Sequence, residues 1–229
     1  MAGPPSCATG SVAIRVGGLD RRYVVTRPAP RSDGHAPPIM LLFHGYSGSP
    51  ESVSDASGLA LSAAVAGWVV VAPEGSGSPS RWAIQQLKGP DDVTFVRAVL
   101  DDVTSNGCAD AARVVSVGYS NGAGFTGVLT CRLRLVGSAM VGGANLAPAC
   151  AVPLGYPLVI AHGEDDDVVP VAGGPVIGGA LQALPLPSTI DAWRSGGGDV
   201  RAVVAPDWGH AWVPGASEAV LAAFATFTS

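Results

Sequence analysis

The sequence predicts an α/β fold in which a mostly parallel sheet has helices on both faces. Short apolar runs alternate along the chain with segments of helical pattern, which is the order of elements in parallel α/β proteins. The runs at 39–43 and 157–161 are almost wholly apolar, as expected for strands that are covered on both faces. The length of 229 residues suits one domain, which we expect to extend over residues 1–229 without an inserted lid domain.

The expected elements follow from apolar periodicity and from turn residues. The clearest helix is 91–106, because its apolar residues recur at helical spacing, aspartates open it and Gly107 ends it. In chain order we expect strands at 12–16, 22–26, 39–43, 68–72, 113–116, 137–141, 157–161 and 200–205, the first two joined as a hairpin, with helices at 54–66, 91–106, 125–134, 189–194 and 217–227.

One segment, Gly118-Tyr119-Ser120-Asn121-Gly122, lies between the strand at 113–116 and the helix at 125–134. A strand, a turn of the form Gly-x-Ser-x-Gly and a helix make up a nucleophile elbow. The turn leaves no room for side chains at its two glycines and holds the serine in a strained conformation with its hydroxyl exposed. The pattern therefore predicts that Ser120 is a nucleophile, the alternative being a solvated serine in a glycine-rich connection.

A serine hydroxyl needs a base that takes its proton and a third group that orients the base. In folds with this elbow, the chain order is serine, acid and histidine, each after a successive strand. Of the four histidines, only His210 follows the last expected strand. His35 and His44 precede the serine, and His162 lies where the acid belongs, so the order selects His210 as the base.

The acid is expected directly after the strand at 157–161, where four acidic residues, 164–167, stand in a row. Such a run is also typical of a solvated, metal-binding or helix-capping loop. The apolar residues that follow indicate that the end of the run turns back into the protein, which favours Asp166 or Asp167 over Glu164. The residues alone do not decide between these two aspartates.

The oxyanion of an acyl-transfer reaction needs two preorganised N–H donors. We expect one from the backbone of Asn121, the residue after the nucleophile, and the other from Tyr46, which follows the strand at 39–43. His44 is expected to brace that loop. Trp82 and Trp212 are expected to form walls of the substrate site, because tryptophan offers a large apolar face at low entropic cost; their alternative is core packing.

Composition excludes several classes of partner. The net charge is −5 without a basic run, which argues against nucleic acid and anionic membrane surfaces. No uninterrupted apolar stretch reaches the ~18 residues of a membrane span, and residues 1–5 have neither the basic start nor the apolar segment of a signal peptide. The four cysteines form no Cys-x-x-Cys pair, so we expect no metal site and no cofactor.

The cysteines also allow disulfides. Cys108 precedes the strand at 113–116, at the end of the sheet remote from Ser120, and Cys131 lies eleven residues after Ser120. A helix of that length returns about 16 Å toward the same end. We therefore expect a Cys108–Cys131 disulfide, with Cys150 at the opposite edge of the sheet and out of reach; two buried thiols are the alternative.

With these motifs the chain resembles the secreted α/β-hydrolase esterases that include polyhydroxybutyrate depolymerases and the related feruloyl and acetylxylan esterases. The resemblance extends from about Arg22 to Phe224, and its most specific parts are the Ser-Asn-Gly-Ala elbow at 120–123 and the His-Gly-x-x-Asp-x-x-Val-Pro segment at 162–170. It implies an α/β-hydrolase fold and assigns the acid to Asp166. One departure is Val213, which separates Trp212 from the Pro-Gly pair that commonly follows it directly in the family.

The resemblance implies a serine carboxylic ester hydrolase that acts through an acyl-enzyme on short-chain, hydroxycinnamate or polyester esters. The substrate could be attached to a polysaccharide or polyester, and we expect an extracellular monomer. Two other functions are weighed against it. A serine peptidase with the same triad usually carries a propeller or cap domain, which this length does not hold, and a non-catalytic binding module does not need an intact order of serine, acid and histidine.

Overall fold

The computed structural model describes residues 7, 9–30, 34–84 and 90–228. Residues 1–5, to which the expectation about a signal peptide refers, lie outside this part, as do residues 85–89 of the loop that carries Trp82. Within the described residues, no helix is both long and apolar enough to cross a membrane.

An eight-stranded sheet in the order β1-β2-β4-β3-β5-β6-β7-β10 forms the centre of the molecule. β2 pairs antiparallel with β1 and with β4, and every other neighbouring pair is parallel. The expected α/β-hydrolase fold with a mostly parallel sheet is confirmed. The strands of the sheet are β1 (Gly10–Val16), β2 (Leu19–Thr26), β3 (Pro38–Phe43), β4 (Val69–Pro73), β5 (Asp110–Tyr119), β6 (Gly137–Val141), β7 (Tyr156–Gly163) and β10 (Gly198–Ala205).

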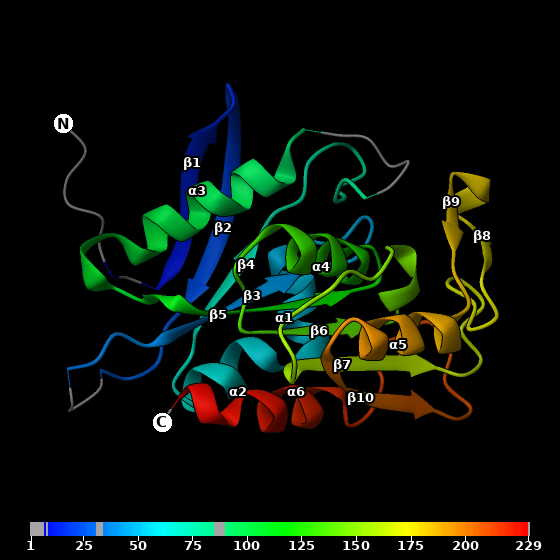
Figure 1. Ribbon diagram of the computed structural model, residues 1–229. Coiled ribbons are helices and arrows are strands. Elements are labelled where there is room, and N and C mark those ends of the chain that lie inside the picture. Colours follow the sequence, from blue (N-terminus) through cyan, green and yellow to red (C-terminus); the bar gives the residue numbers. More distant parts are fainter. Residues whose placement is uncertain (1–6, 8, 31–33, 85–89, 229) are drawn as a thin grey trace.

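Helices cover both faces of the sheet (Figure 1). One face carries α3 (Asp92–Thr104), α4 (Asn121–Arg132) and α5 (Leu186–Ser195), and the other carries α1 (Pro50–Ser57), α2 (Leu59–Val65) and α6 (Ala216–Phe224). Short 3-10 turns lie at Ser105–Gly107, Ala144–Leu146, Ile177–Gly179 and Ala225–Phe227.

The alternating side chains of a strand explain why β3 is apolar throughout. Ile39, Leu41 and Phe43 pack into the core beneath α3, α4 and α5, whereas Met40 and Leu42 pack into the core beneath α1, α2 and α6. A strand with a core on each face has no polar side, so its sequence shows an unbroken apolar run rather than an alternation.

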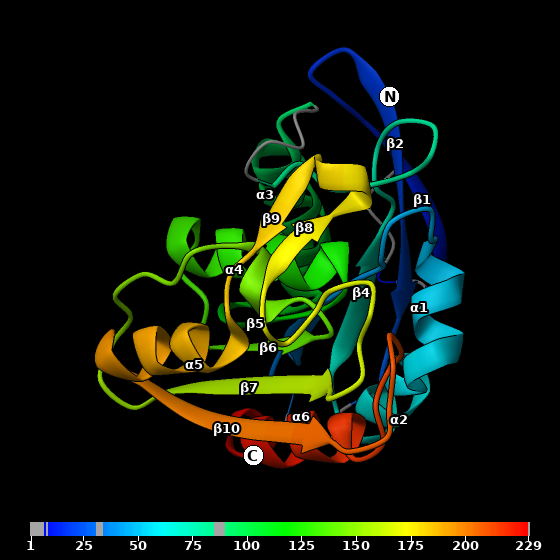
Figure 2. The same cartoon turned by 90° about the vertical axis from the view of Figure 1, so that its right-hand side faces the viewer.

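Two local features differ from the expectation. The helix expected at 54–66 is two helices, because Gly58 has φ 64° and ends α1 in the left-handed conformation that favours glycine. The chain also forms a small antiparallel hairpin that was not expected, of β8 (Gly174–Val176) and β9 (Leu181–Ala183). This hairpin stands at the end of the sheet toward which β7 and β10 run (Figures 1 and 2).

The disulfides join Cys7 to Cys108 and Cys131 to Cys150, so the expected Cys108–Cys131 link is wrong. β6 and β7 are parallel, and the connection between them must therefore return from the end of β6 to the opposite edge of the sheet, where β7 begins. Cys150 lies near the end of this return, and α4 has brought Cys131 back to the same edge. Their Cα atoms are 5.9 Å apart.

Candidate active site

Ser120 stands in the turn between β5 and α4 with φ 54° and ψ −119°, a strained conformation for a residue other than glycine. A Cβ at Gly118 would lie 2.1 Å from the carbonyl oxygen of Gly122, and a Cβ at Gly122 would lie 2.5 Å from the carbonyl oxygen of His44. No side chain fits at either glycine. The tightness that the sequence predicts for this elbow is therefore confirmed.

Three side chains meet above the carboxyl ends of the parallel strands. The Nε2 of His210 lies 2.9 Å from the Oγ of Ser120, and its Nδ1 lies 2.8 Å from the Oδ2 of Asp166. Because the carboxylate only accepts, Nδ1 carries the hydrogen and Nε2 is left to accept from the serine hydroxyl. Ser120 follows β5, Asp166 follows β7 and His210 follows β10, so this arrangement can transfer a proton from serine to imidazole.

The structure distinguishes Asp166 from its acidic neighbours. Its side chain is buried, while Glu164, Asp165 and Asp167 are exposed. The Oδ1 of Asp166 accepts hydrogen bonds from the N–H groups of Val168 at 3.0 Å and Val169 at 2.7 Å, the two apolar residues that turn the chain inward.

The carboxylate of Asp166 stays ionised in this environment. Burial by itself would raise the pKa of Asp166, but hydrogen bonds from His162, from His210 and from the N–H of Val169 outweigh it and hold the pKa well below its usual range. A charged acid beside His210 keeps the imidazole oriented and stabilises the imidazolium that forms when the serine proton is taken.

His162 is a second imidazole on the same carboxylate, a contact that the sequence pattern does not predict. It is fully buried at the end of β7, where its Nε2 lies 2.8 Å from the carbonyl oxygen of Val169 and 3.2 Å from the Oδ2 of Asp166. Both neighbours accept, so Nε2 is the donor. Among the described residues its Nδ1 has no hydrogen-bond partner. The signal for this contact is its i, i+4 spacing from the acid.

Tyr119 supports His210 from the other side and was also missed. Its ring stacks on the imidazole with centroids 5.3 Å apart, and its hydroxyl donates to the carbonyl oxygen of His210 at 3.2 Å. Burial, together with the charge of Asp166, raises the pKa of Tyr119 to about 12. The phenol therefore remains a neutral donor at neutral pH.

The two expected oxyanion donors, Tyr46 and Asn121, line the same hollow as Ser120. Asn121 is the first residue of α4, so its N–H has no partner within the helix. Within the part of the chain that the structure describes, neither the Asn121 N–H nor the Tyr46 N–H donates a hydrogen bond. Both amides are thus free to bind an anionic oxygen.

Trp82 is not a wall of the substrate site, and this expectation is corrected. Its side chain has no exposed surface, and its ring stacks on Phe125 with centroids 5.0 Å apart. The chain returns from the 75–81 loop toward the core at this position, which places the indole behind the elbow. Its Nε1 donates to the carbonyl oxygen of His44 at 2.9 Å, and its backbone bonds the side chain of Asn121.

His44 braces the loop after β3, in line with its expected role. Its Nε2 accepts the N–H of Gly75 at 2.9 Å, and its Nδ1 donates to the carbonyl oxygen of Gly45 at 2.7 Å. Burial lowers the pKa of His44, which is consistent with a neutral ring that accepts at one nitrogen. His44, Trp82 and Asn121 together tie the Tyr46 loop to the start of α4.

Trp212 also lies away from the substrate hollow. Its Nε1 donates to the Oγ of Ser217 at 2.9 Å, its ring packs beside Tyr119, and it is not among the residues that line the hollow beside Ser120. The extra Val213 is fully buried in a small core with Val141 and Ala161, which holds this loop against the sheet. Trp212 therefore supports the loop that carries His210.

A hollow of about 330 Å³ opens beside Ser120. Apolar side chains from four separate segments surround the nucleophile, and one of these segments is the hairpin β8–β9. The residues that line it are Gly45, Tyr46, Tyr119, Ser120, Asn121, Leu146, Val168, Val169, Val176, Ile177 and His210.

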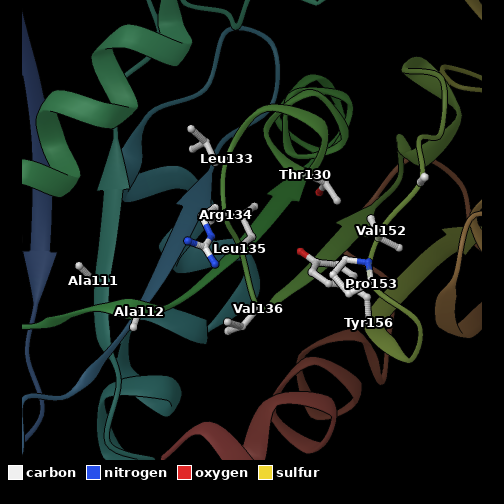
Figure 3. A pocket seen from close by; sticks show the side chains of 11 residues that line it. Ala111, Ala112, Thr130, Leu133, Arg134, Leu135, Val136, Val152, Pro153 and Tyr156 are labelled. Atoms are coloured by element: carbon white, nitrogen blue, oxygen red, sulfur yellow. The ribbon is translucent and has the colours of Figure 1, made fainter.

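A second hollow, of about 550 Å³, lies between the end of α4, the start of β5 and the start of β7 (Figure 3). Two of the residues that line it, Thr130 and Tyr156, have hydroxyls that bond the Oγ of Ser138, at 2.7 Å and 2.8 Å. In the part of the chain that the structure describes, these hydroxyls bond one another and the carbonyl oxygen of Thr126, and no imidazole or carboxylate contacts them that could act as a base. Among the described residues, no group of three or more His, Cys, Asp or Glu side chains could hold a metal ion.

Sequence comparisons find proteins that are described as a lipase family and as esterases. A family model described as secretory lipase matches residues 54–143, which include the elbow. The chain is 32% identical over 191 residues to the putative esterase NocK of Nocardia uniformis, covering 72% of this chain and 53% of that protein. It is 27% identical over 180 residues to feruloyl esterase B of Piromyces equi, covering 72% and 32%. The chain thus spans about half and about a third of these relatives.

Solved structures share the fold at low sequence identity. Esterase 2 of Thermogutta terrifontis superposes with a TM-score of 0.68 at 15% identity, covering 94% of this chain and 91% of the other. An S-formylglutathione hydrolase of Agrobacterium tumefaciens gives a TM-score of 0.70 at 12% identity, covering 96% and 95%. Both likenesses extend over nearly the whole of each chain, as the resemblance read from the sequence implies.

Proposed function

We propose, from the premise that this chain has the α/β-hydrolase fold, that it is a serine carboxylic ester hydrolase. The observation that carries the proposal is the line of hydrogen bonds from Ser120 through His210 to Asp166, at 2.9 Å and 2.8 Å, on a strained elbow. The esterases among its relatives support the same reaction.

In the first half of the reaction, the Oγ of Ser120 attacks the acyl carbon while the Nε2 of His210 takes its proton. The carbonyl oxygen becomes an oxyanion that accepts from the N–H groups of Tyr46 and Asn121. Collapse of this intermediate breaks the bond to the alcohol oxygen, which takes the proton from His210 and leaves. The product is an acyl-enzyme on Ser120.

In the second half, His210 takes a proton from water as the water oxygen attacks the acyl carbon. The second tetrahedral intermediate expels the Oγ of Ser120, which regains its proton from His210, and the carboxylic acid leaves. Asp166 remains ionised throughout and offsets the positive charge of His210 in both halves.

The natural substrates that we propose are esters of short-chain or hydroxycinnamic acids, or soluble polyester oligomers. A hollow of about 330 Å³ with largely apolar walls favours a compact apolar acyl group. Two of the relatives are described as feruloyl esterases, which supports the hydroxycinnamate class. Two disulfides favour an oxidising compartment, and we propose an extracellular location.

Release of p-nitrophenol from acetyl and butyryl esters, measured for the parent and for Ser120→Ala, tests the reaction. The substrate class is tested by kcat/KM for methyl ferulate and for acyl chains of increasing length, above and below their solubility limit. We expect turnover of short acyl esters or of ferulate without a rate increase at the emulsion boundary. A preference for acyl chains of about twelve carbons or more, with a jump at that boundary, would contradict the proposed substrates, since a compact hollow cannot bury such a chain.

A further inference from the structure

Ile177 has a backbone conformation that isoleucine rarely adopts. It lies at the tip of the β8–β9 hairpin with φ 51°, in the left-handed region. A side chain branched at Cβ crowds its own backbone there, so such a residue is a genuine outlier rather than an ordinary turn residue. Strained residues of this kind cluster at sites where the side chain serves a function.

The turn itself does not require an isoleucine. Gly178 and Gly179 follow with φ 62° and φ 87°, and a Cβ at either would meet no atom within 4 Å. Hairpin turns with consecutive positive φ values favour glycine, asparagine or aspartate at these positions. A small or polar residue at 177 would make the same turn with less strain, so the reason for isoleucine must be sought in what its side chain touches.

The Ile177 side chain lines the hollow beside Ser120. The apolar walls of this hollow are of two kinds. Leu146, Val169 and Val176 are buried and form a fixed floor, whereas Tyr46, Val168 and Ile177 are 38%, 48% and 38% exposed and form a rim. Large apolar residues that stay exposed together at a concave site are typical of a ligand-binding surface.

The base of the hairpin is anchored to the body of the protein, and this fixes the position of Ile177 on the rim. Val176 pairs with Leu181, and both are buried. Below them, the N–H of Leu184 donates to the carbonyl oxygen of Asn145 at 2.8 Å, and the Nδ2 of Asn145 donates back to the carbonyl oxygen of Leu184 at 2.8 Å. Two buried apolar side chains and a reciprocal pair of hydrogen bonds can hold the strained tip against relaxation.

We infer that Ile177 is a specificity-determining residue that limits the size of the apolar group accepted beside Ser120. This inference rests on the proposed esterase function and deepens it. A compact group fills the space between the floor and Ile177 and leaves its carbonyl carbon at the Oγ of Ser120. A longer group meets the Ile177 side chain before its carbonyl carbon reaches that position.

The test compares the parent with Ile177→Gly and Ile177→Asn on p-nitrophenyl butyrate and octanoate, which share one leaving group. Ile177→Gly opens the rim, and we expect the octanoate-to-butyrate ratio of kcat/KM to rise about tenfold, the effect of a change of a few methylenes in an apolar pocket. Asparagine tolerates the left-handed conformation. The Tm of Ile177→Asn should therefore equal or exceed that of the parent, although the apolar contact of residue 177 is removed.

Leu184→Asn is the matched control, because Leu184 is an exposed apolar residue directly after β9 that does not line the hollow. Its octanoate-to-butyrate ratio of kcat/KM should equal that of the parent. If the parent hydrolyses esters through Ser120 and the ratio is unchanged in Ile177→Gly, the inference is overturned while the proposed function stands. A Tm of Ile177→Asn below that of the parent would contradict the backbone strain at Ile177, on which the inference depends. If the parent has no turnover that Ser120→Ala abolishes, the proposed function fails and the inference fails with it.

Discussion

The Nε2 of His162 lies 3.2 Å from the Oδ2 of Asp166, the same oxygen to which His210 donates at 2.8 Å. One carboxylate oxygen thus receives two imidazole N–H groups, while the other receives two backbone N–H groups, from Val168 and Val169. The carboxylate is held on every side, so its orientation toward His210 does not depend on the base alone. His162 acts through Asp166 and is a positioning residue.

We predict that His162→Leu lowers kcat roughly tenfold with little change in KM, because a hydrogen bond to a charged group contributes about 1.5–3 kcal/mol and each ~1.4 kcal/mol corresponds to a factor of ten. His162→Gln keeps an N–H donor near the same place and should recover most of the rate. Steady-state kinetics of the three proteins measure this. Equal rates for Leu and Gln variants would show that the donor has no part in positioning.

The three central residues should behave as a unit. We predict that Ser120→Ala, Asp166→Asn and His210→Ala each lower kcat roughly 10³-fold or more, with much smaller changes in KM. The neighbours supply the control: Asp165→Asn and Asp167→Asn should stay within about tenfold of the parent, since both side chains are exposed. A dead Asp167→Asn beside an active Asp166→Asn would refute the assignment of the acid.

The brace behind the elbow predicts a different pattern. Trp82→Phe removes the indole donor to the His44 carbonyl, so we predict a fall in kcat of up to about tenfold, by the same factor for butyrate and for ferulate esters. A substrate wall would instead change the ratio between the two. Trp212→Phe loses an indole bond to Ser217 away from the hollow and is the matched control. A changed ratio in Trp82→Phe alone would restore Trp82 to the substrate site.

Residue order and turn chemistry were sufficient to predict the sheet, the elbow and His210, because these depend on local pattern and on chain direction. They placed the catalytic acid within residues 164–167 without settling on one of the four. The choice depends on which side chain accepts hydrogen bonds from the N–H groups of residues 168 and 169, and that contact forms only in the folded loop. The direction of an aromatic side chain in a loop is set by tertiary packing, and so Trp82 was misplaced. The strands β8 and β9 have three residues each, which is too short for an apolar period to show.

The disulfides can be checked directly. Mass mapping of non-reduced peptides should recover Cys7 linked to Cys108 and Cys131 linked to Cys150. The second bridge closes a short loop, with a sequence separation of 19. We predict that the double variant Cys131→Ser/Cys150→Ser loses roughly 3 kcal/mol of unfolding free energy, mainly because its unfolded chain gains freedom. A peptide that links Cys108 to Cys131 would contradict the pairing.

The stability of the protein should depend on pH through His44, whose pKa burial lowers. The neutral ring accepts the N–H of Gly75 at Nε2. Protonation of Nε2 would turn this acceptor into a donor and break the hydrogen bond, because the Gly75 N–H can only donate. Below the unfolded pKa of about 6.5, His44 is protonated in the unfolded chain but stays neutral in the folded protein. The free energy of unfolding therefore falls as pH decreases through this value. Asp166, whose pKa is lowered, is ionised in both states above pH ~5 and adds nothing in this window.

We therefore predict that the unfolding free energy decreases by about 1 kcal/mol between pH 7.5 and pH 5.5, the linkage contribution of one proton over about one pH unit below the unfolded pKa. His44→Gln keeps an acceptor for the Gly75 N–H but cannot be protonated, so its decrease should be smaller by that amount. Urea unfolding of both proteins at the two pH values measures the difference, and the other histidines cancel in the comparison. An equal pH dependence in parent and variant would mean that His44 takes up its proton as readily in the folded protein as in the unfolded chain.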